Sequence, residues 1–246
     1  MTINPTGRVC GDGRLVRKKV GFGLAAAIFF GFILNAYADS NSFKPGETII
    51  YNIHQIGIKV GEATLVFKGP VEYKGKDAVL IVFTADGFNF YDKEMIYLDP
   101  KTYKPLYVLR DLNIFGNKEK ISEEYLSAQG KINIVKEAGG KTEKTVLVNK
   151  SVIDNLYGFI YRYRLNGSFQ MGDKLDIHLP TKDITIELKK QTRLSAAGKV
   201  FNSFYMESDP AKYKLWFAVD AKKIPLRISG AIGVANTAMI MKEYKE

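Results

Sequence analysis

The sequence predicts a mainly β protein with a strongly curved antiparallel sheet, a partial barrel or barrel-like fold, and one covering helix near 151–165. Three observations support this prediction. After residue 43, apolar and polar residues alternate along most of the chain. Turn-forming residues recur about every ten positions, and only the segment 151–165 has helical spacing. The ten-residue spacing of turns continues on both sides of that segment, which favours one domain. A division near residue 150 is an alternative.

The alternation is clearest in two segments. In 183–191, DITIELKKQ, the apolar residues Ile184, Ile186 and Leu188 occupy every second position. In 214–220, KLWFAVD, Trp216 points to the face opposite Leu215 and Phe217. Such alternation is typical of antiparallel strands with one buried and one wetter face. Candidate turns lie at 57–61, 73–76, 99–100, 116–117, 129–130, 139–140 and 220–222. Counting between turns predicts about a dozen strands.

The helical segment reads SVIDNLYGFIYRYRL. Its apolar residues recur at helical spacing, so one stripe is expected to cover the sheet. Ser151 or Asp154 is expected to cap its start by accepting hydrogen bonds from free backbone N–H groups, and Asn166-Gly167 is expected to end it. Gly158 within the helix costs about 1 kcal/mol of helix propensity. If the helix closes one mouth of the curved sheet, it also forms a cavity wall.

The N-terminal residues have the three parts of a secretory signal. Basic residues cluster at 14–19, the segment 20–36 has no charge, and Ala36-Tyr37-Ala38 supplies small residues before a cleavage site. We therefore expect residues 1–38 to be removed after Ala38, leaving an exported β-rich domain, 39–246, in the periplasm. An uncleaved inner-membrane anchor is the alternative. Cys10, the only cysteine, would leave with the signal, and a bacterial periplasmic protein does not require disulfides.

The charge pattern favours solubility and leaves one class of partner open. Of 36 basic and 26 acidic residues, five and one precede residue 39, so the expected mature chain carries a net charge of +6. These charges are scattered, without a run of five or six like charges, which favours a role in solubility. Attraction to anionic lipid headgroups or acidic polysaccharide is the functional alternative. An exported chain is not expected to bind nucleic acid.

Neither a metal site nor a catalytic motif stands out. Residues 39–246 contain two histidines, His54 and His178, and no cysteine, whereas zinc sites need three or four ligands. Nucleophile, Walker and calcium-loop motifs are absent from the sequence, so we expect no cofactor. Four aspartates lie fairly close in sequence, but nothing selects a catalytic pair among them: Asp86, Asp92, Asp99 and Asp111. An enzyme is therefore not expected. An envelope hydrolase that uses His54 or His178 with carboxylates stays open.

Aromatic residues are the most suggestive surplus. Large apolar side chains usually form core, but a curved sheet of this size can also enclose a ligand cavity. Six residues are candidates for the wall of such a cavity, and each is explained equally by ordinary core packing: Tyr51, Ile53, Phe90, Tyr157, Tyr161 and Trp216.

Three segments resemble a known bacterial family. They are the start, FKPGETIIY with IGIKVGEATL, the middle, DNLYGFIYRYR, and the end, LWFAVDAKKIPLRI. All three are similar to the family called domain of unknown function 3108. The resemblance implies an exported protein with a β-rich fold and no assigned activity. The last hairpin also looks like the periplasmic lipoprotein-carrier folds, in which a curved sheet closed by helices holds acyl chains.

These observations lead to one hypothesis and two alternatives. We expect a non-enzymatic envelope protein that binds or carries an apolar or lipid-like ligand. The first alternative is a structural or protein-interaction module that meets another envelope protein. The second is the envelope hydrolase.

Overall fold

The computed structural model describes residues 43–148, 153–232 and 236–246. The predicted signal segment, 1–38, lies outside these residues. The first eight strands are β1 (Thr48–Gln55), β2 (Ile58–Tyr73), β3 (Lys76–Gly87), β4 (Phe90–Leu98), β5 (Pro105–Ile114), β6 (Asn117–Leu126), β7 (Lys131–Ala138) and β8 (Lys141–Val148). A short 3-10 turn, η1 (Ser127–Gln129), precedes β7, and the helix α1 (Leu156–Asn166) follows β8. The remaining strands are β9 (Lys174–Leu179), β10 (Lys182–Ala196), β11 (Lys199–Asp209), β12 (Lys214–Ala218), β13 (Pro225–Ser229) and β14 (Thr237–Lys245).

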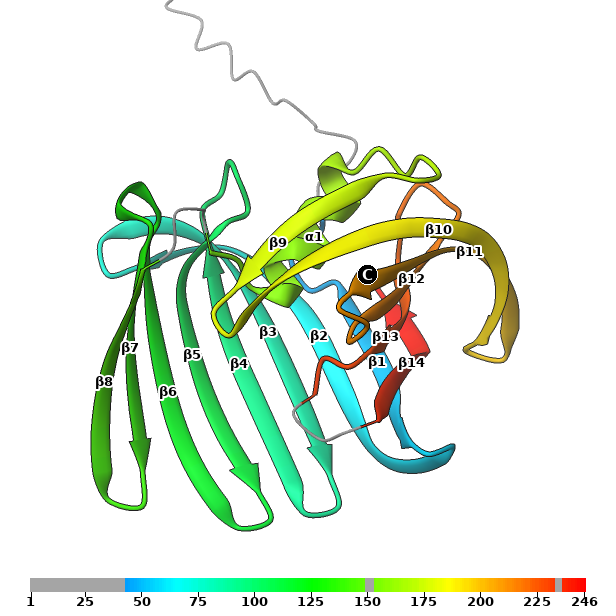
Figure 1. The fold of residues 1–246 in the computed structure, drawn as a ribbon. Coiled ribbons are helices and arrows are strands. Elements are labelled where there is room, and N and C mark those ends of the chain that lie inside the picture. The colour runs from blue at the N-terminus through cyan, green and yellow to red at the C-terminus, as the bar shows by residue number, and fades with distance from the viewer. Residues whose placement is uncertain (1–42, 149–152, 233–235) are drawn as a thin grey trace, which may run out of the picture. The chain divides into compact units, whose positions relative to one another are not determined.

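All of these strands belong to one antiparallel sheet of 14 strands, in the order β8-β7-β6-β5-β4-β3-β2-β1-β14-β13-β12-β11-β10-β9. Strands β1–β8 form one meander and β9–β14 a second. The pairing of β1 with β14 joins them, as in Tyr51 opposite Met241. Figure 1 shows β3–β8 side by side and the long strands β10 and β11 bending strongly. The mainly β, curved antiparallel fold that the sequence predicts is confirmed.

The sheet does not close on itself, because its two edge strands, β8 and β9, are not paired with each other. The chain that follows β8 nevertheless meets β9. Ile153 forms an isolated parallel bridge with His178, and the Asp154 N–H donates to the His178 carbonyl oxygen at 2.6 Å. This contact places the start of α1 beside β9.

Period-two burial gives the sheet an inner face that packs against α1. In β1, Ile49, Tyr51 and Ile53 are fully buried, whereas Asn52 and His54 on the other face are partly exposed. The first turn lies at Ile56-Gly57 and overlaps the predicted 57–61 bend only at Gly57, which has a φ of +80°, because β2 already begins at Ile58. The buried cluster combines side chains from both meanders with those of α1.

The helix lies deeper than its sequence suggests. Most of its residues are buried, including the charged Arg164, so it is buried nearly all round instead of covering the sheet with one stripe. A Cβ at Gly158 would lie 3.0 Å from the Leu98 side chain, so the glycine allows close packing against β4. Among the described residues, no helix is long and apolar enough to cross a membrane.

The helix cap differs from the one expected. Asn155 is the N-cap, and its Oδ1 accepts hydrogen bonds from the N–H groups of Tyr157 at 2.9 Å and Gly158 at 3.2 Å. Asp154, one of the two expected caps, instead forms a bidentate ion pair with Arg162. Ser151 lies outside the described residues. At the other end, Gly167 follows the helix as expected, and its N–H donates to the Tyr163 carbonyl oxygen.

Candidate functional site

The six predicted cavity residues lie in different parts of the structure. All except Trp216 are buried in the core. Tyr51 donates to the Pro225 carbonyl oxygen at 2.9 Å, and Tyr157 stacks on Phe83 with ring centroids 4.3 Å apart. These contacts already satisfy much of the packing that a ligand would supply.

The remaining predicted residues divide between the two faces of the sheet. Tyr161 packs edge-on against Phe43 at 4.8 Å between ring centroids. Trp216 lies on the opposite face, where it contacts Tyr205 and the guanidinium of Arg227. Ile53 and Phe90 lie in the core. Tyr157 is the member of the set that also borders an open cleft.

The two histidines lie on strands that are not neighbours. His54 is on β1, and its Nδ1 has no hydrogen-bond partner among the described residues. His178 is on β9, and its Nδ1 lies 2.9 Å from an Asp183 carboxylate oxygen. Within the described part of the chain, no three His, Cys, Asp or Glu side chains are grouped so that they could hold a metal ion.

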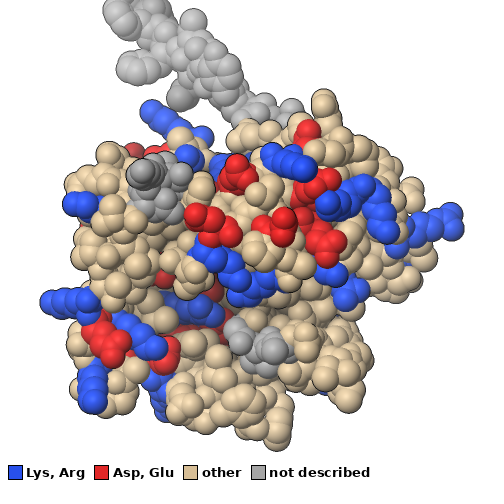
Figure 2. Space-filling model, in the orientation of Figure 1, with Lys and Arg blue, Asp and Glu red and all other residues tan. Residues whose placement is uncertain are grey.

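A cleft opens where the inner face of β4–β6 meets the start of α1, the turn between β9 and β10, and Tyr213. We call it the Glu94 cleft. It encloses about 160 Å³ and is lined by Glu94, Val108, Arg110, Glu123, Tyr125, Asn155, Leu156, Tyr157, Leu179, Pro180, Thr181, Tyr213 and Ala231. Figure 2 shows a hollow in the region that β5 and β6 occupy in Figure 1, with basic and acidic side chains inside it.

Strand pairing assembles the charged floor of the cleft. Glu94 on β4 stands opposite Arg110 on β5 in the antiparallel register. The Arg110 guanidinium donates to both carboxylate oxygens of Asp92, at 2.8 and 2.5 Å. Its Nε lies farther from Glu94, 3.4 Å from Oε1. Arg110 therefore pairs mainly with Asp92, and its electrostatic attraction to Glu94 is weaker.

Glu94 is poorly satisfied for a buried carboxyl group. The other contact of its carboxylate is a long hydrogen bond from Asn155 Nδ2 to Oε2, at 3.4 Å. Burial raises the pKa of Glu94 from 4.5 to about 7; Arg110 opposes the rise, and the carboxylates of Asp92 and Glu123 add to it. Glu94 can therefore gain or lose a proton near neutral pH.

Two tyrosines and a second glutamate complete the floor. The Tyr125 hydroxyl donates to Glu123 Oε2 at 2.5 Å, and burial raises the pKa of Glu123. The Tyr157 hydroxyl is buried and makes no hydrogen bond to a described residue. Burial, and then the negative field of Glu94, raise the pKa of Tyr157. The floor thus holds more carboxylates than cations, together with an unused hydroxyl.

This arrangement can bind a polar group. A ligand ammonium or hydroxyl could donate to Glu94, and the Tyr157 hydroxyl could serve as donor or acceptor. The lining residues include no serine, cysteine or histidine. Val108, Leu156 and Leu179 provide an apolar wall.

Sequence reasoning missed Glu94, Arg110 and Glu123. Asp92 was among the four aspartates noted in the sequence, but without a partner. A signal was present in β4, because Asp92 and Glu94 share the parity of Ile96 and Leu98 and so occupy the apolar face. Charges on the buried face of a strand are uncommon unless they are paired.

Comparison with protein families identifies the chain. The family model described as "Protein of unknown function (DUF3108)" matches residues 50–242. The chain belongs to this family. The resemblance noted in the sequence is therefore confirmed, and Glu94, Arg110, Glu123 and α1 all lie within the DUF3108 match. The family has no established activity, and no curated protein matches the chain.

Three solved structures have some similarity to this DUF3108 chain. A β-barrel-like protein of domain of unknown function DUF1849 from Brucella abortus is 10% identical, with 81% of this chain and 96% of that chain covered and a TM-score of 0.48. A proposed exported protein with a YmcC-like fold from Bacteroides fragilis is 9% identical, with 82% and 97% covered and a TM-score of 0.32. A proposed lipoprotein from Parabacteroides distasonis is 8% identical, with 82% and 96% covered and a TM-score of 0.28. At these scores we draw no functional conclusion from them.

Proposed function

We propose that this protein is an exported, non-enzymatic envelope protein that binds a small amphipathic, lipid-like ligand in the Glu94 cleft. The polar head of the ligand would carry a hydrogen-bond donor, preferably an ammonium group, and would contact Glu94. The apolar part would lie along Val108, Leu156 and Leu179.

One observation carries this proposal. Glu94 is 7% exposed and has only long contacts to Arg110 and Asn155, beside the Tyr157 hydroxyl that has no described partner. Leaving buried polar groups unsatisfied costs about 1–3 kcal/mol each, and more for charged groups. A ligand that donates to these groups would recover part of that free energy on binding.

Export is supported by the sequence alone. The basic cluster, the uncharged segment and the small residues before Asp39 favour removal of residues 1–38 and release into the periplasm. Retention through an uncleaved N-terminal anchor would place the same domain at the inner membrane. The cleft would be available to an envelope ligand in either case.

Calorimetry with three eight-carbon probes that differ in their polar group tests the ligand chemistry. We expect n-octylammonium to bind residues 39–246 more tightly than octanol, and octanoate to bind weakest. Ionisation of Glu94 near pH 7 should make octylammonium bind more tightly at pH 8 than at pH 6. E94Q should weaken that binding by about tenfold or more, as expected for loss of a charge-assisted contact.

The matched control is E143Q, which removes a carboxylate from the exposed strand β8 and should leave octylammonium binding unchanged. The proposal is wrong if none of the probes binds, if octanoate binds as tightly as octylammonium, or if E94Q has no effect. Because E94Q preserves side-chain shape, circular dichroism should show the same fold. The pH dependence of binding to the unmodified protein is the second measurement should that variant fail to fold.

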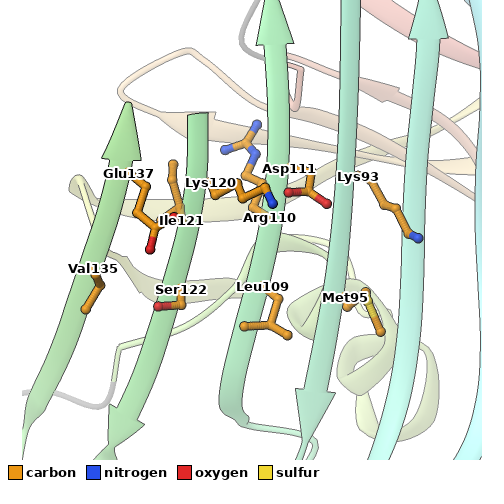
Figure 3. A pocket seen from close by; sticks show the side chains of 10 residues that line it. All are labelled: Lys93, Met95, Leu109, Arg110, Asp111, Lys120, Ile121, Ser122, Val135 and Glu137. Carbon is orange, nitrogen blue, oxygen red and sulfur yellow. The ribbon is translucent and has the colours of Figure 1, made fainter. Parts of the chain in front are cut away.

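A second candidate function is a protein-interaction module of the envelope. It is favoured by a shallow groove of about 270 Å³ on the outer face of β4–β7. Figure 3 shows Met95, Leu109 and Val135 in one row across these strands, with Lys93, Asp111, Lys120 and Glu137 in the next. Leu109→Ser should abolish capture of an envelope protein in cross-linking from living cells if this function is correct, and should leave octylammonium binding intact. Unchanged capture would contradict it.

A further inference from the structure

Two lysines lie beside the ring of Tyr213, which lines the Glu94 cleft. Lys182 directly follows the lining residue Thr181, and Lys212 directly precedes the lining residue Tyr213. Their ammonium nitrogens lie 5.8 and 5.2 Å from the centroid of the same Tyr213 ring. Two positive charges from different parts of the chain thus meet over one aromatic ring.

Neither lysine forms an ion pair with a carboxylate of the described residues, unlike Lys189 and Lys242, which do. Desolvation, and then repulsion by Lys212, lower the pKa of Lys182. Like charges held close together without a counterion raise the free energy of the folded protein. An anion bound between the two ammonium groups would replace this repulsion with two attractions.

Tyr213 is acted on by charges of both signs. Burial raises the pKa of Tyr213, while Lys182 lowers it and Glu94 raises it. Both charges therefore lie close enough to act on one hydroxyl group. Tyr213 is accordingly influenced by a carboxylate of the cleft floor and by an ammonium group beside its own ring.

We propose that the Glu94 cleft recognises a zwitterionic head group in which a primary amine and a phosphate are separated by a few bonds, as in phosphoethanolamine. The ammonium would lie at Glu94, and the phosphate would lie between Lys182 and Lys212. The cleft volume of about 160 Å³ suits a small head group. The hydrocarbon of a lipid would continue along the apolar wall of Val108, Leu156 and Leu179 and out of the cleft. This inference rests on the proposed function, because it assumes that Glu94 binds the amine.

The test compares O-phosphoethanolamine, ethanolamine and inorganic phosphate by calorimetry at pH 8. We expect phosphoethanolamine to bind about tenfold or more tightly than ethanolamine, because the phosphate adds charge-assisted hydrogen bonds. The double variant K182Q/K212Q should remove this gain and leave ethanolamine binding unchanged. E94Q should weaken the binding of both ethanolamine and phosphoethanolamine. The matched control K141Q/K144Q removes two lysines from exposed strand β8 and should change nothing.

The outcomes separate this inference from the proposed function. Suppose that octylammonium binds through Glu94. If phosphoethanolamine then binds no more tightly than ethanolamine, or still binds more tightly in K182Q/K212Q, the inference is wrong and the proposed function stands. If the lysines bind phosphate equally well with or without the amine, and E94Q has no effect, both are wrong. If no probe binds, both are wrong as well.

A final arm distinguishes a free metabolite from a lipid. Phosphatidylcholine vesicles with and without phosphatidylethanolamine are sedimented with the protein. Binding that increases with phosphatidylethanolamine and falls in K182Q/K212Q identifies a lipid head group. Binding of O-phosphoethanolamine in calorimetry without any increase on vesicles identifies a soluble ligand.

Discussion

Arg164 on helix α1 and Glu47, which lies 117 residues earlier in the chain, form an ion pair that is almost completely buried. The guanidinium donates to both carboxylate oxygens, at 2.7 and 3.0 Å, and also to the Lys222 carbonyl oxygen. Phe43 lies against the guanidinium at 4.3 Å from the ring centroid. This contact joins the helix, the segment before β1 and the loop after β12.

Breaking this pair should destabilise the protein strongly. Arg164→Met leaves the Glu47 carboxylate buried without its cation, which typically costs about 3–5 kcal/mol in the free energy of unfolding. Urea denaturation followed by circular dichroism measures the loss. The double variant E47L/R164M should recover part of it, since neither charge is then left alone. Arg193→Met, at an exposed position, is the control, and an equal effect of both single changes would contradict the prediction.

The buried Glu94 should make stability fall with rising pH. Its pKa is 4.5 in the unfolded chain and about 7 in the folded protein. Between these values the folded state binds more protons than the unfolded state, so the free energy of unfolding decreases as pH rises through this window. It levels off above about pH 7. Denaturation at several pH values should therefore show a steeper decline for the unmodified protein than for E94Q. Identical slopes would refute the assignment.

Asn155 should stabilise both the helix and the cleft. Asn155→Ala removes the acceptor for two backbone N–H groups and should cost about 1 kcal/mol, within the usual 0.5–2 kcal/mol for a lost N-cap. Asn155→Ser keeps a capping oxygen and should cost much less in the same thermal denaturation experiment. Both variants lose the hydrogen bond to Glu94, so an equal change of octylammonium binding in both, with the larger stability loss in Asn155→Ala, separates the two roles. Equal stability of the two variants would count against the cap.

The glycines of the opening hairpin should differ in their sensitivity. A Cβ at Gly61 would lie 2.3 Å from the Asp86 carbonyl oxygen, so Gly61→Ala must push β2 away from β3. We expect a loss of about 1–3 kcal/mol or more, as for overpacking elsewhere. Gly57 has open space around it but a φ of +80°, so Gly57→Ala should cost only about 1 kcal/mol. Chemical denaturation of both variants measures the difference, and the reverse order would contradict this account.

Export should remove the first 38 residues. Intact-mass measurement of the protein in a periplasmic extract should give a chain that begins at Asp39, since small residues occupy the positions before that bond. Ala38→Phe should block the cleavage and keep the protein with the membrane fraction. Full-length protein in the membrane fraction without this change would instead show an anchor.

Local periodicity predicted a mainly β fold, several of its turns and a helix after β8, but about a dozen strands where the described part of the chain has 14. Side-chain parity is set by the backbone of each strand, so segments such as 183–191 can be read without knowledge of their neighbours. The same local reading placed Trp216 on the face opposite Leu215, where the structure has it. The family was indicated separately, by the resemblance of three motifs to DUF3108, and the match over residues 50–242 confirms it.

Contacts between distant segments could not be read in this way. Glu94 meets Arg110 only because β4 and β5 pair in one particular register, and Asn155 reaches Glu94 only because α1 is buried against that sheet. The expected caps at Ser151 and Asp154 were chosen on residue type alone. In the structure the Asp154 carboxylate instead accepts hydrogen bonds from Arg162. Residue type cannot show which polar group is already engaged.

The sequence by itself therefore determined the class of fold, the strand faces, the predicted signal and the family. Only the tertiary structure decided where the unsatisfied charges lie. Whether a charged group is satisfied depends on the residue beside it, as for Glu94 with Arg110 or Lys182 with Lys212. Their interaction depends on distance and burial, which are set by strand register and by the packing of α1 inside the sheet. The candidate site consequently lies in a charged cleft beside Tyr157 and not in the aromatic core.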